Sequence, residues 1–326
     1  MSFSINEIVI SGTTKRSEFK MDSTEYGCIH GIIWEPADKK AHDILQITHG
    51  MTEHMGRYER FAEELVTRGI AIAGFQIPGH GEVPQKIAAW GRCGWGNSLK
   101  AMHELHQELT ARYTGKHFHL GFSLGSYLLR EYLSVYPEDH LDGVILIGTG
   151  EQPAFVLSVM KKIIACEMKK TGTDGTDDLI HQLSFGNYNK KFAPNHTSAD
   201  WLCADNTELE KYLADPLCRE DISAGLFYDL ISAMHRVCNV KSMSSWKKRM
   251  PILLLAGEQD PVGDMGKGTR KTWKKMTKAG IKDIEFHLFP GVRHDLLHEY
   301  DSDTAPKVID CIIEWINRKE EKVDEA

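Results

Sequence analysis

Three polar residues far apart in the chain, Ser123, Asp260 and His294, have the types and the order needed for nucleophilic catalysis. Ser123 lies in the stretch HLGFSLGSYLLREY (119–132), inside a Gly-x-Ser-x-Gly motif bounded by Gly121 and Gly125. A serine hydroxyl is a weak nucleophile until a base takes its proton, and an imidazole oriented by a carboxylate can serve as that base. The sequence therefore predicts that His294 deprotonates Ser123 and that Asp260 holds the imidazole.

A serine at position 123 could instead cap a helix, because serine is among the preferred N-cap residues. The motif by itself is a weak signal, since such short patterns also arise by chance. Its context favours a nucleophile: an apolar strand precedes it, an amphipathic helix follows, and the two glycines remove bulk on either side. A sharp strand-to-helix turn of this kind lifts the hydroxyl above the sheet, at the positive end of the new helix.

Asp260 and His294 each follow an apolar run that predicts a buried strand. The runs are ILLLAGEQDPV for the acid and IEFHLFPGVRHDLLHEY for the histidine. Loops at the carboxyl ends of strands are where open α/β sheets hold their sites. Three other acids compete with Asp260 for the orienting role, and Asp260 is preferred over all of them: Glu258, Asp264 and Asp295.

Five other histidines are interpreted as structural. His294 and His298 are four residues apart, a spacing that could suggest a metal site, but the segment has no H-E-x-x-H glutamate and no third ligand. Two further pairs fall in a predicted strand and on a predicted helix face: His117 with His119, and His103 with His106. We therefore expect no metal and no cofactor.

The oxyanion of a tetrahedral intermediate needs hydrogen-bond donors, each contributing about 3 kcal/mol to lowering the barrier. One predicted donor is the backbone N–H of Leu124, directly after the serine. The second is the backbone N–H of Met51, in the segment QITHGMTEHMGRY, where His49 and Gly50 turn the chain. Alone, that turn would be an ordinary loop; beside a matched serine, acid and histidine it favours an oxyanion loop.

Short apolar runs alternate with helical patterns over most of the chain, which indicates an α/β protein with a mostly parallel sheet. The predicted strands cover 28–34, 43–49, 70–75, 117–122, 143–148, 251–257 and 284–289, and the predicted helices cover 58–68, 97–113, 124–136, 269–279 and 304–318. The first two of these strands are joined by the short turn EPADKKAH, which predicts an antiparallel hairpin.

Residues 151–240 break this alternation, because they contain helical patterns and no convincing strand. We expect a core formed by residues 1–150 and 241–326, with 151–240 inserted as a helical cap over one end of the sheet. The first helix of the insertion has an apolar face that either packs on the core or lines an acyl pocket. That face comprises Phe155, Val156, Val159, Met160, Ile163 and Ile164.

Composition excludes several classes of protein. The 326 residues carry a formal net charge of −7 with no basic stripe, which argues against nucleic acid as a partner. No apolar run approaches the roughly 20 residues of a transmembrane helix, and no signal peptide is evident at the start. The seven scattered cysteines fit reduced thiols, so a cytoplasmic location is expected. Oligomeric state is left open.

Several short motifs occur in a characteristic order between about residues 25 and 318. They are H-G-x-x-E-H (49–54), G-H-G (79–81), the Gly-x-Ser-x-Gly turn, ADPLC (214–218), GEQDPVG (257–263) and the late histidine. Together they resemble the monoacylglycerol lipase and lysophospholipase branch of the α/β-hydrolases, among the serine aminopeptidase S33-type hydrolases. The resemblance implies an eight-stranded, mostly parallel sheet with helices on both faces and a helical cap inserted after the sixth strand.

The same resemblance implies the roles of individual residues. Ser123, Asp260 and His294 would form the catalytic triad, with the Met51 and Leu124 amides as oxyanion donors. Glu53 and Arg57 match positions that brace the oxyanion loop by an ion pair. The chain departs from the branch at four positions that leave every catalytic group in place: Phe122 and Ser126 in the elbow, and Gln76 and Pro78 before the G-H-G motif.

The predicted function is hydrolysis of carboxylic esters through an acyl-enzyme. The expected substrates are monoacylglycerols, lysophospholipids or short- to medium-chain acyl esters, with transient contact to a membrane surface as an option. The same triad could serve a thioesterase or an aminopeptidase, and the acidic residues Asp177, Asp178 and Asp205 in the insertion keep the latter open. A non-catalytic binding protein on a hydrolase scaffold is the alternative from another class.

Overall fold

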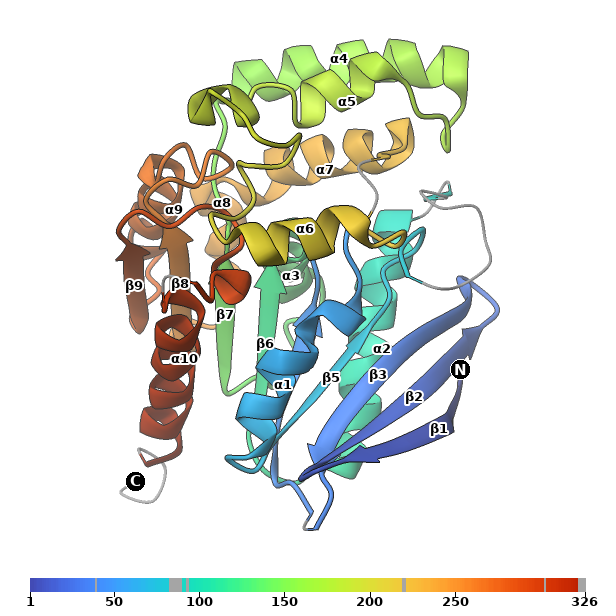
Figure 1. Ribbon diagram of the computed structural model, residues 1–326, viewed down its shortest axis with the longest axis vertical. Coiled ribbons are helices and arrows are strands. Elements are labelled where there is room, and N and C mark those ends of the chain that lie inside the picture. The colour runs from blue at the N-terminus through green and yellow to red at the C-terminus, as the bar shows by residue number, and fades with distance from the viewer. Residues whose placement is uncertain (39, 82–89, 92–93, 219–220, 302, 322–326) are drawn as a thin grey trace.

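A nine-stranded, mostly parallel sheet runs through the centre of the molecule, as the computed structural model shows (Figure 1). The structure describes residues 1–38, 40–81, 90–91, 94–218, 221–301 and 303–321. The strands are β1 (Ser2–Ser11), β2 (Thr14–Ser23), β3 (Gly27–Pro36), β4 (Asp43–Thr48), β5 (Ile70–Phe75), β6 (His117–Phe122), β7 (Gly143–Ile147), β8 (Ile252–Gly257) and β9 (Ile284–Phe289). Their spatial order is β1-β2-β3-β5-β4-β6-β7-β8-β9.

The predicted fold class is confirmed, with two corrections at the start of the chain. The strands β1 and β2 precede the first predicted strand, so the sheet has nine strands rather than eight. The predicted hairpin across EPADKKAH is wrong, because β3 pairs antiparallel with β5 and not with β4. The apolar strand β4 pairs in parallel with β5 on one side and β6 on the other. A strand buried on both faces belongs in the middle of a sheet, and because β5 and β6 occupy both edges of β4, none is left for β3.

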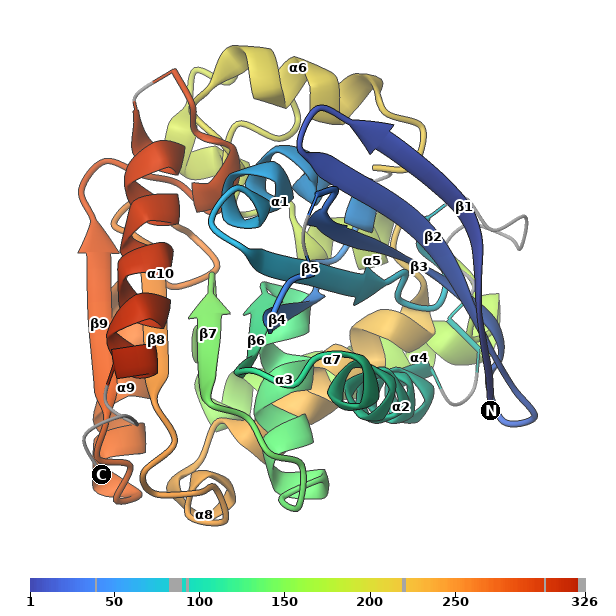
Figure 2. The same cartoon turned by 90° about the horizontal axis from the view of Figure 1, so that it is seen from below.

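Helices cover both faces of this sheet, as the view from below shows (Figure 2). On one face, α1 (Glu59–Val66) and α10 (Thr304–Glu321) bury Phe61 and Trp315 against the strands. On the other, α2 (Gly94–Arg112), α3 (Leu124–Val135) and α9 (Lys267–Lys278) contribute side chains such as Leu105, Leu128 and Met276 to a second core. Two apolar layers thus hold the parallel strands in place, with their carboxyl ends at one edge.

The chain between β7 and β8 forms helices that lie over these carboxyl ends (Figure 1). They are α4 (Ala154–Thr171), α5 (Asp178–Ser184), η2 (Asn189–Phe192), α6 (Asn206–Ala214) and α7 (Ala224–Val237). The short α8 (Val240–Met243) follows α7 and contacts the end of α3 instead. No strand occurs among the described residues from 148 to 250. The insertion follows the seventh strand rather than the sixth, because the chain has extra strands at its start.

The apolar face predicted for the first of these helices is divided in the structure. Of the predicted face, Ile164 is buried and Met160 lines a cavity; Leu157, which that face did not include, is buried beside them. The other row points outward, with Phe155 72%, Val159 53% and Ile163 38% exposed. Packing on the core describes Ile164, and lining a pocket describes Met160. Neither interpretation describes the exposed residues Phe155, Val159 and Ile163. None of the described helices is long and apolar enough to cross a membrane.

Candidate active site

Ser123 occupies the turn between β6 and α3, in a backbone conformation that L-amino acids rarely adopt. Its φ is 49° and its ψ is −114°. The flanking glycines make this turn possible: a Cβ on Gly121 would lie 2.6 Å from the Gly125 carbonyl oxygen, and a Cβ on Gly125 would lie 1.9 Å from the Thr48 carbonyl oxygen. Strain of this kind is characteristic of nucleophile turns. Although Ser123 stands at the N-cap of α3, its side chain makes no capping hydrogen bond.

The Ser123 hydroxyl instead lies 2.9 Å from Nε2 of His294. The other ring nitrogen, Nδ1, lies 2.9 Å from Oδ1 of Asp260, so three residues separated by up to 171 positions form one hydrogen-bonded series. With the Nδ1 proton directed at the carboxylate, Nε2 can accept the serine proton. Burial disfavours the imidazolium, but the Asp260 carboxylate outweighs it and raises the pKa of His294 above its usual value.

The structure also distinguishes Asp260 from the other acids that the sequence offers for orienting His294. Asp260 is wholly buried, and its Oδ1 also accepts a hydrogen bond of 2.8 Å from the Val262 amide. Glu258 is exposed and accepts from the Gly291 amide. Asp295 points to Arg57 and His298 rather than to the His294 ring. Asp260 is thus the acid that hydrogen-bonds the His294 ring, whereas Glu258 and Asp295 have other partners.

The predicted oxyanion donors, Met51 and Leu124, both line the cavity that contains Ser123. Leu124 is the first residue of α3, so its N–H has no acceptor within the helix. The segment before Met51 is held by His49, whose Nε2 accepts from the Ile77 amide and whose Nδ1 lies 2.7 Å from the Gly50 carbonyl oxygen. Burial lowers the pKa of His49 well below its usual value, which keeps the ring neutral for this double contact.

The buried carboxylate of Glu53 holds the oxyanion loop from below. It accepts from the Gly50 amide at 2.5 Å, from the Tyr58 hydroxyl at 2.9 Å and from the Arg57 guanidinium at 2.6 Å. Arg57 also donates to Asp295 at 2.8 Å, and thereby joins the loop to the residue after His294. His298, which the sequence analysis interprets as structural, contacts Asp295 and the Arg57 carbonyl oxygen, in line with that interpretation.

A largely apolar cavity of about 260 Å³ opens beside Ser123. Most of its lining comes from the segment between β7 and β8, which includes α7. Sequence motifs do not identify those residues. They include Met160, Leu183, Phe185, Tyr188, Trp201, Phe227, Leu230, Ile231 and Met234. Apolar and aromatic residues in a strandless insertion are a general signal for such a wall, but only the fold shows which of them face the serine.

Two other groups of side chains could be mistaken for reactive or metal-binding sites. His54, Asp215 and Cys218 have ligand atoms close together, but Nδ1 of His54 accepts from the Gly56 amide and Nε2 lies 2.8 Å from Asp215. This pattern places the ring proton on Nε2, which donates it to the Asp215 carboxylate. The donor set is thus explained by a hydrogen bond between the loop and the segment after α6.

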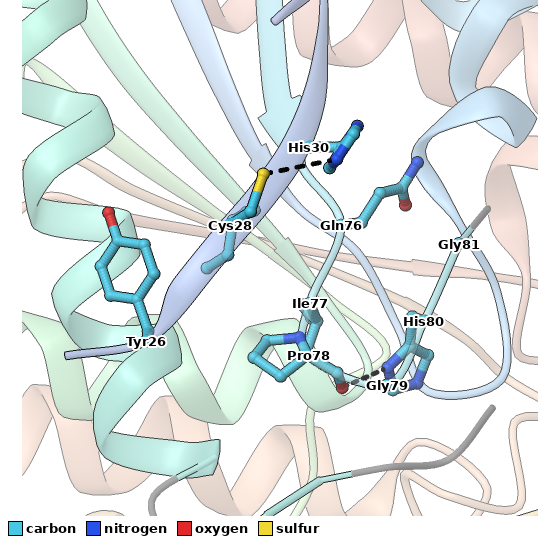
Figure 3. Close-up of a pocket in the computed structure, with 10 residues that line it drawn as sticks. Tyr26, Cys28, His30, Gln76, Ile77, Pro78, Gly79, His80 and Gly81 are labelled. Atoms are coloured by element: carbon cyan, nitrogen blue, oxygen red, sulfur yellow. Dashed lines mark hydrogen bonds between the residues drawn. The ribbon is translucent and has the colours of Figure 1, made fainter. Parts of the chain in front are cut away.

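Cys28 and His30 line a separate small pocket of about 60 Å³ between β3 and the segment after β5 (Figure 3). The Cys28 sulfur lies 3.5 Å from Nε2 of His30. Burial, together with Asp22, raises the pKa of the Cys28 thiol. A reactive cysteine needs the opposite shift. This pair therefore lacks the electrostatic environment of a second nucleophile.

Comparison with known proteins bears on the family and the fold of this chain. The family model described as serine aminopeptidase, S33 matches residues 39–301. The human monoglyceride lipase is 24% identical over 291 residues, covering 88% of this chain and 86% of the relative. An abhydrolase domain-containing protein of Dictyostelium discoideum is 22% identical over 293 residues, but the chain spans only 27% of that longer protein.

Solved structures are similar over almost the whole chain. A thermostable carboxyl esterase from Bacillus coagulans, solved in complex with glycerol, has a TM-score of 0.83 and 23% identity, with 97% of this chain and 98% of the esterase covered. A likeness at this identity shows the fold, and the fold is that of esterases and lipases. The family match covers well over half of the chain, so this protein is a member of the serine aminopeptidase, S33 family of α/β-hydrolases.

Proposed function

We propose that this protein is a serine hydrolase that cleaves carboxylic esters through an acyl-enzyme. The observation that carries the proposal is the hydrogen-bonded series from Ser123 through His294 to Asp260, at the wall of an apolar cavity. Ser123 would attack the ester carbonyl while His294 takes its proton, and the amides of Met51 and Leu124 would bind the oxyanion. His294 would then protonate the leaving alcohol, and water would release the acid.

The lining of the cavity supports an acyl ester rather than a peptide with a free amino terminus. An aminopeptidase needs an acidic side chain near the scissile bond to hold the substrate ammonium. The described lining contains no aspartate or glutamate. Asp177 and Asp205 instead cap α5 and α6 through backbone amides, and Asp178 is exposed. A monoacylglycerol or a short- to medium-chain ester fits an apolar wall with the serine at one end.

We also propose that residues 151–240 act as a cap that shapes the acyl site. Most of the lining side chains come from this segment, and its helices α4 to α7 lie above the carboxyl ends of the strands (Figure 1). Helix α4 turns Met160 toward the cavity and keeps an apolar row outside. This row is a candidate for transient contact with a lipid surface when a water-insoluble ester is delivered.

A substrate panel tests the proposal. Purified protein is assayed with p-nitrophenyl esters of two to sixteen carbons, a monoacylglycerol, an acyl thioester and aminoacyl p-nitroanilides. We expect ester turnover that rises with chain length until the cavity is filled, and loss of at least 10³-fold in Ser123→Ala. Ser158→Ala, an exposed serine in α4, is the matched control. Faster turnover of the anilides or the thioester would replace the ester assignment by a peptidase or a thioesterase.

A further inference from the structure

Two aromatic rings contact the imidazole of His294 in addition to its two hydrogen-bond partners. The Phe122 ring centroid lies 5.0 Å from the imidazole centroid, and the Trp201 centroid lies 5.4 Å from it, at interplanar angles of 35° and 37°. Phe122 precedes the serine at the end of β6, whereas Trp201 belongs to the segment between η2 and α6. The two rings make no described ring contact with each other. The imidazole thus contacts one ring that belongs to the sheet and one that belongs to the insertion.

The segment that carries Trp201 is fastened to the loop that carries His294. The Arg293 guanidinium donates to the carbonyl oxygens of Asp200 at 2.5 Å and Cys203 at 2.9 Å. The Asp295 amide donates to the Leu202 carbonyl oxygen at 2.8 Å. These bonds involve the residues directly before and after His294. The position of the indole is therefore tied to the backbone of the histidine itself.

Trp201 also contacts two aromatic residues of the cavity wall, Phe185 and Tyr188. Its ring stacks on Phe185 with centroids 5.5 Å apart and an interplanar angle of 25°, and it contacts Tyr188 at 5.1 Å. All three of these aromatic residues line the cavity beside Ser123. A continuous row of rings therefore runs from the cavity wall to the imidazole.

This environment favours a fixed and dry imidazole that becomes a cation during the reaction. His294 is only 1% exposed, so water has almost no access to its ring. Aromatic faces within about 6 Å attract a cation, and the attraction grows when water is excluded. The His294 ring contacts two aromatic side chains and is hydrogen-bonded at both nitrogens. It therefore cannot turn away from the serine without displacing a packed side chain. Two elements of the fold thus restrict the same proton-transfer geometry.

We propose that Trp201 is a positioning residue for His294: it holds the imidazole in line between Ser123 and Asp260 and stabilises its imidazolium form. The inference rests on the proposed function, because it assigns a role through the proposed base. It adds that the insertion supplies part of the proton-transfer geometry as well as the wall of the acyl site. The role differs from that of the neighbouring Phe185, which lines the same cavity and has no described ring contact with His294.

The test compares Trp201→Phe, which keeps an aromatic face, with Trp201→Leu, which keeps an apolar side chain without one. The substrate is p-nitrophenyl acetate, whose acyl group is too small to depend on the cavity wall. For Trp201→Leu we expect kcat to fall about 10-fold, KM to stay within 2-fold, and the acid limb of kcat/KM to move to lower pH. Trp201→Phe should restore most of the rate, and Trp273→Leu, a matched control in α9 whose ring stacks on Phe286 away from the cavity, should leave kcat and the pH profile unchanged.

Labelling with a fluorophosphonate separates this inference from the function on which it rests. Wild type and Trp201→Leu should both reach one adduct per chain, the variant more slowly. If wild type is labelled but Trp201→Leu keeps the wild-type kcat and pH profile, or changes KM alone, Trp201 is only a wall residue and the inference is wrong. If wild type is not labelled, the proposed function fails instead. Should Trp201→Leu not fold, Trp201→Met carries the same expectations.

Discussion

Replacing Glu53 by glutamine tests how the oxyanion loop is held. One oxygen of Glu53 accepts from the Gly50 amide and the Tyr58 hydroxyl, and the other accepts from Arg57. Glutamine keeps one acceptor but turns an NH₂ group, which can only donate, toward the guanidinium or toward the amide. The substitution therefore breaks either the ion pair or the support of Gly50, one residue before the proposed oxyanion donor Met51.

The size of the effect follows from burial. The side chains of Glu53 and Arg57 are 2% and 10% exposed, and breaking a buried ion pair typically costs about 3–5 kcal/mol. Asp295 still pairs with Arg57 in the variant, which places the cost near 3 kcal/mol. An unfolding entropy of about 2.1 cal/mol/K per residue corresponds to about 0.7 kcal/mol/K for 326 residues. The expected decrease in Tm is thus about 4 °C.

The catalytic effect should exceed the effect on stability. Complete loss of one oxyanion donor lowers kcat by about 10²–10³, so a loosened loop should lower it by about 10-fold or more while the protein stays folded at 25 °C. Differential scanning calorimetry and ester turnover measure the two quantities, and Glu63→Gln, an exposed acid on α1, is the control. A Tm within 1 °C of wild type together with an unchanged kcat would refute the proposed support of the oxyanion loop.

Three further predictions concern the acid Asp260, the nucleophile elbow at Gly125 and the buried histidine His119. Asp260→Asn removes the carboxylate that raises the pKa of His294, so kcat should fall by 10³-fold or more and the acid limb of kcat/KM should move to lower pH; an unshifted limb would contradict the pairing. Gly125→Ala places a Cβ against the Thr48 carbonyl oxygen and should abolish soluble expression or lower Tm sharply, whereas Gly96→Ala in α2, where a Cβ meets nothing within 4 Å, should be tolerated; equal behaviour would contradict the close packing at the elbow. Burial lowers the pKa of His119 to about 3, so the folded state cannot take up the proton that the unfolded chain binds below about pH 6.5, and stability is lost as pH falls. His119→Leu should reduce the slope of unfolding free energy against pH by about 1.4 kcal/mol per unit between pH 6 and 4, measured by urea denaturation, and an unchanged slope would count against a neutral buried ring.

Much of the fold could be predicted because parallel strands buried on both faces tend to be continuous apolar runs, as in β5, β7 and β8. The strands β1 and β2 do not have this property, since they lie at the edge and mix polar with apolar residues. The short connection from β3 to β4 suggested a hairpin, because local sequence does not reveal that β5 would enter between them. Strand order depends on long-range pairing, and a connection of a given length does not specify it.

The residues of the candidate site divide in the same way. Ser123, Asp260 and His294 could be named because each chemical role demands a residue type at a strand end. Trp201 and Asp295 could not, because an indole over an imidazole and a carboxylate on Arg57 are relations between distant segments. Their side chains are also common in ordinary cores and ion pairs.

The most direct test of the proposed nucleophile is covalent capture by a fluorophosphonate, followed by intact mass measurement and peptide mapping. The account predicts one adduct per chain on Ser123, no adduct in Ser123→Ala, and labelling at least 10²-fold slower in His294→Ala because the hydroxyl then has no base. An unlabelled wild-type protein, or an adduct on another residue, would contradict it.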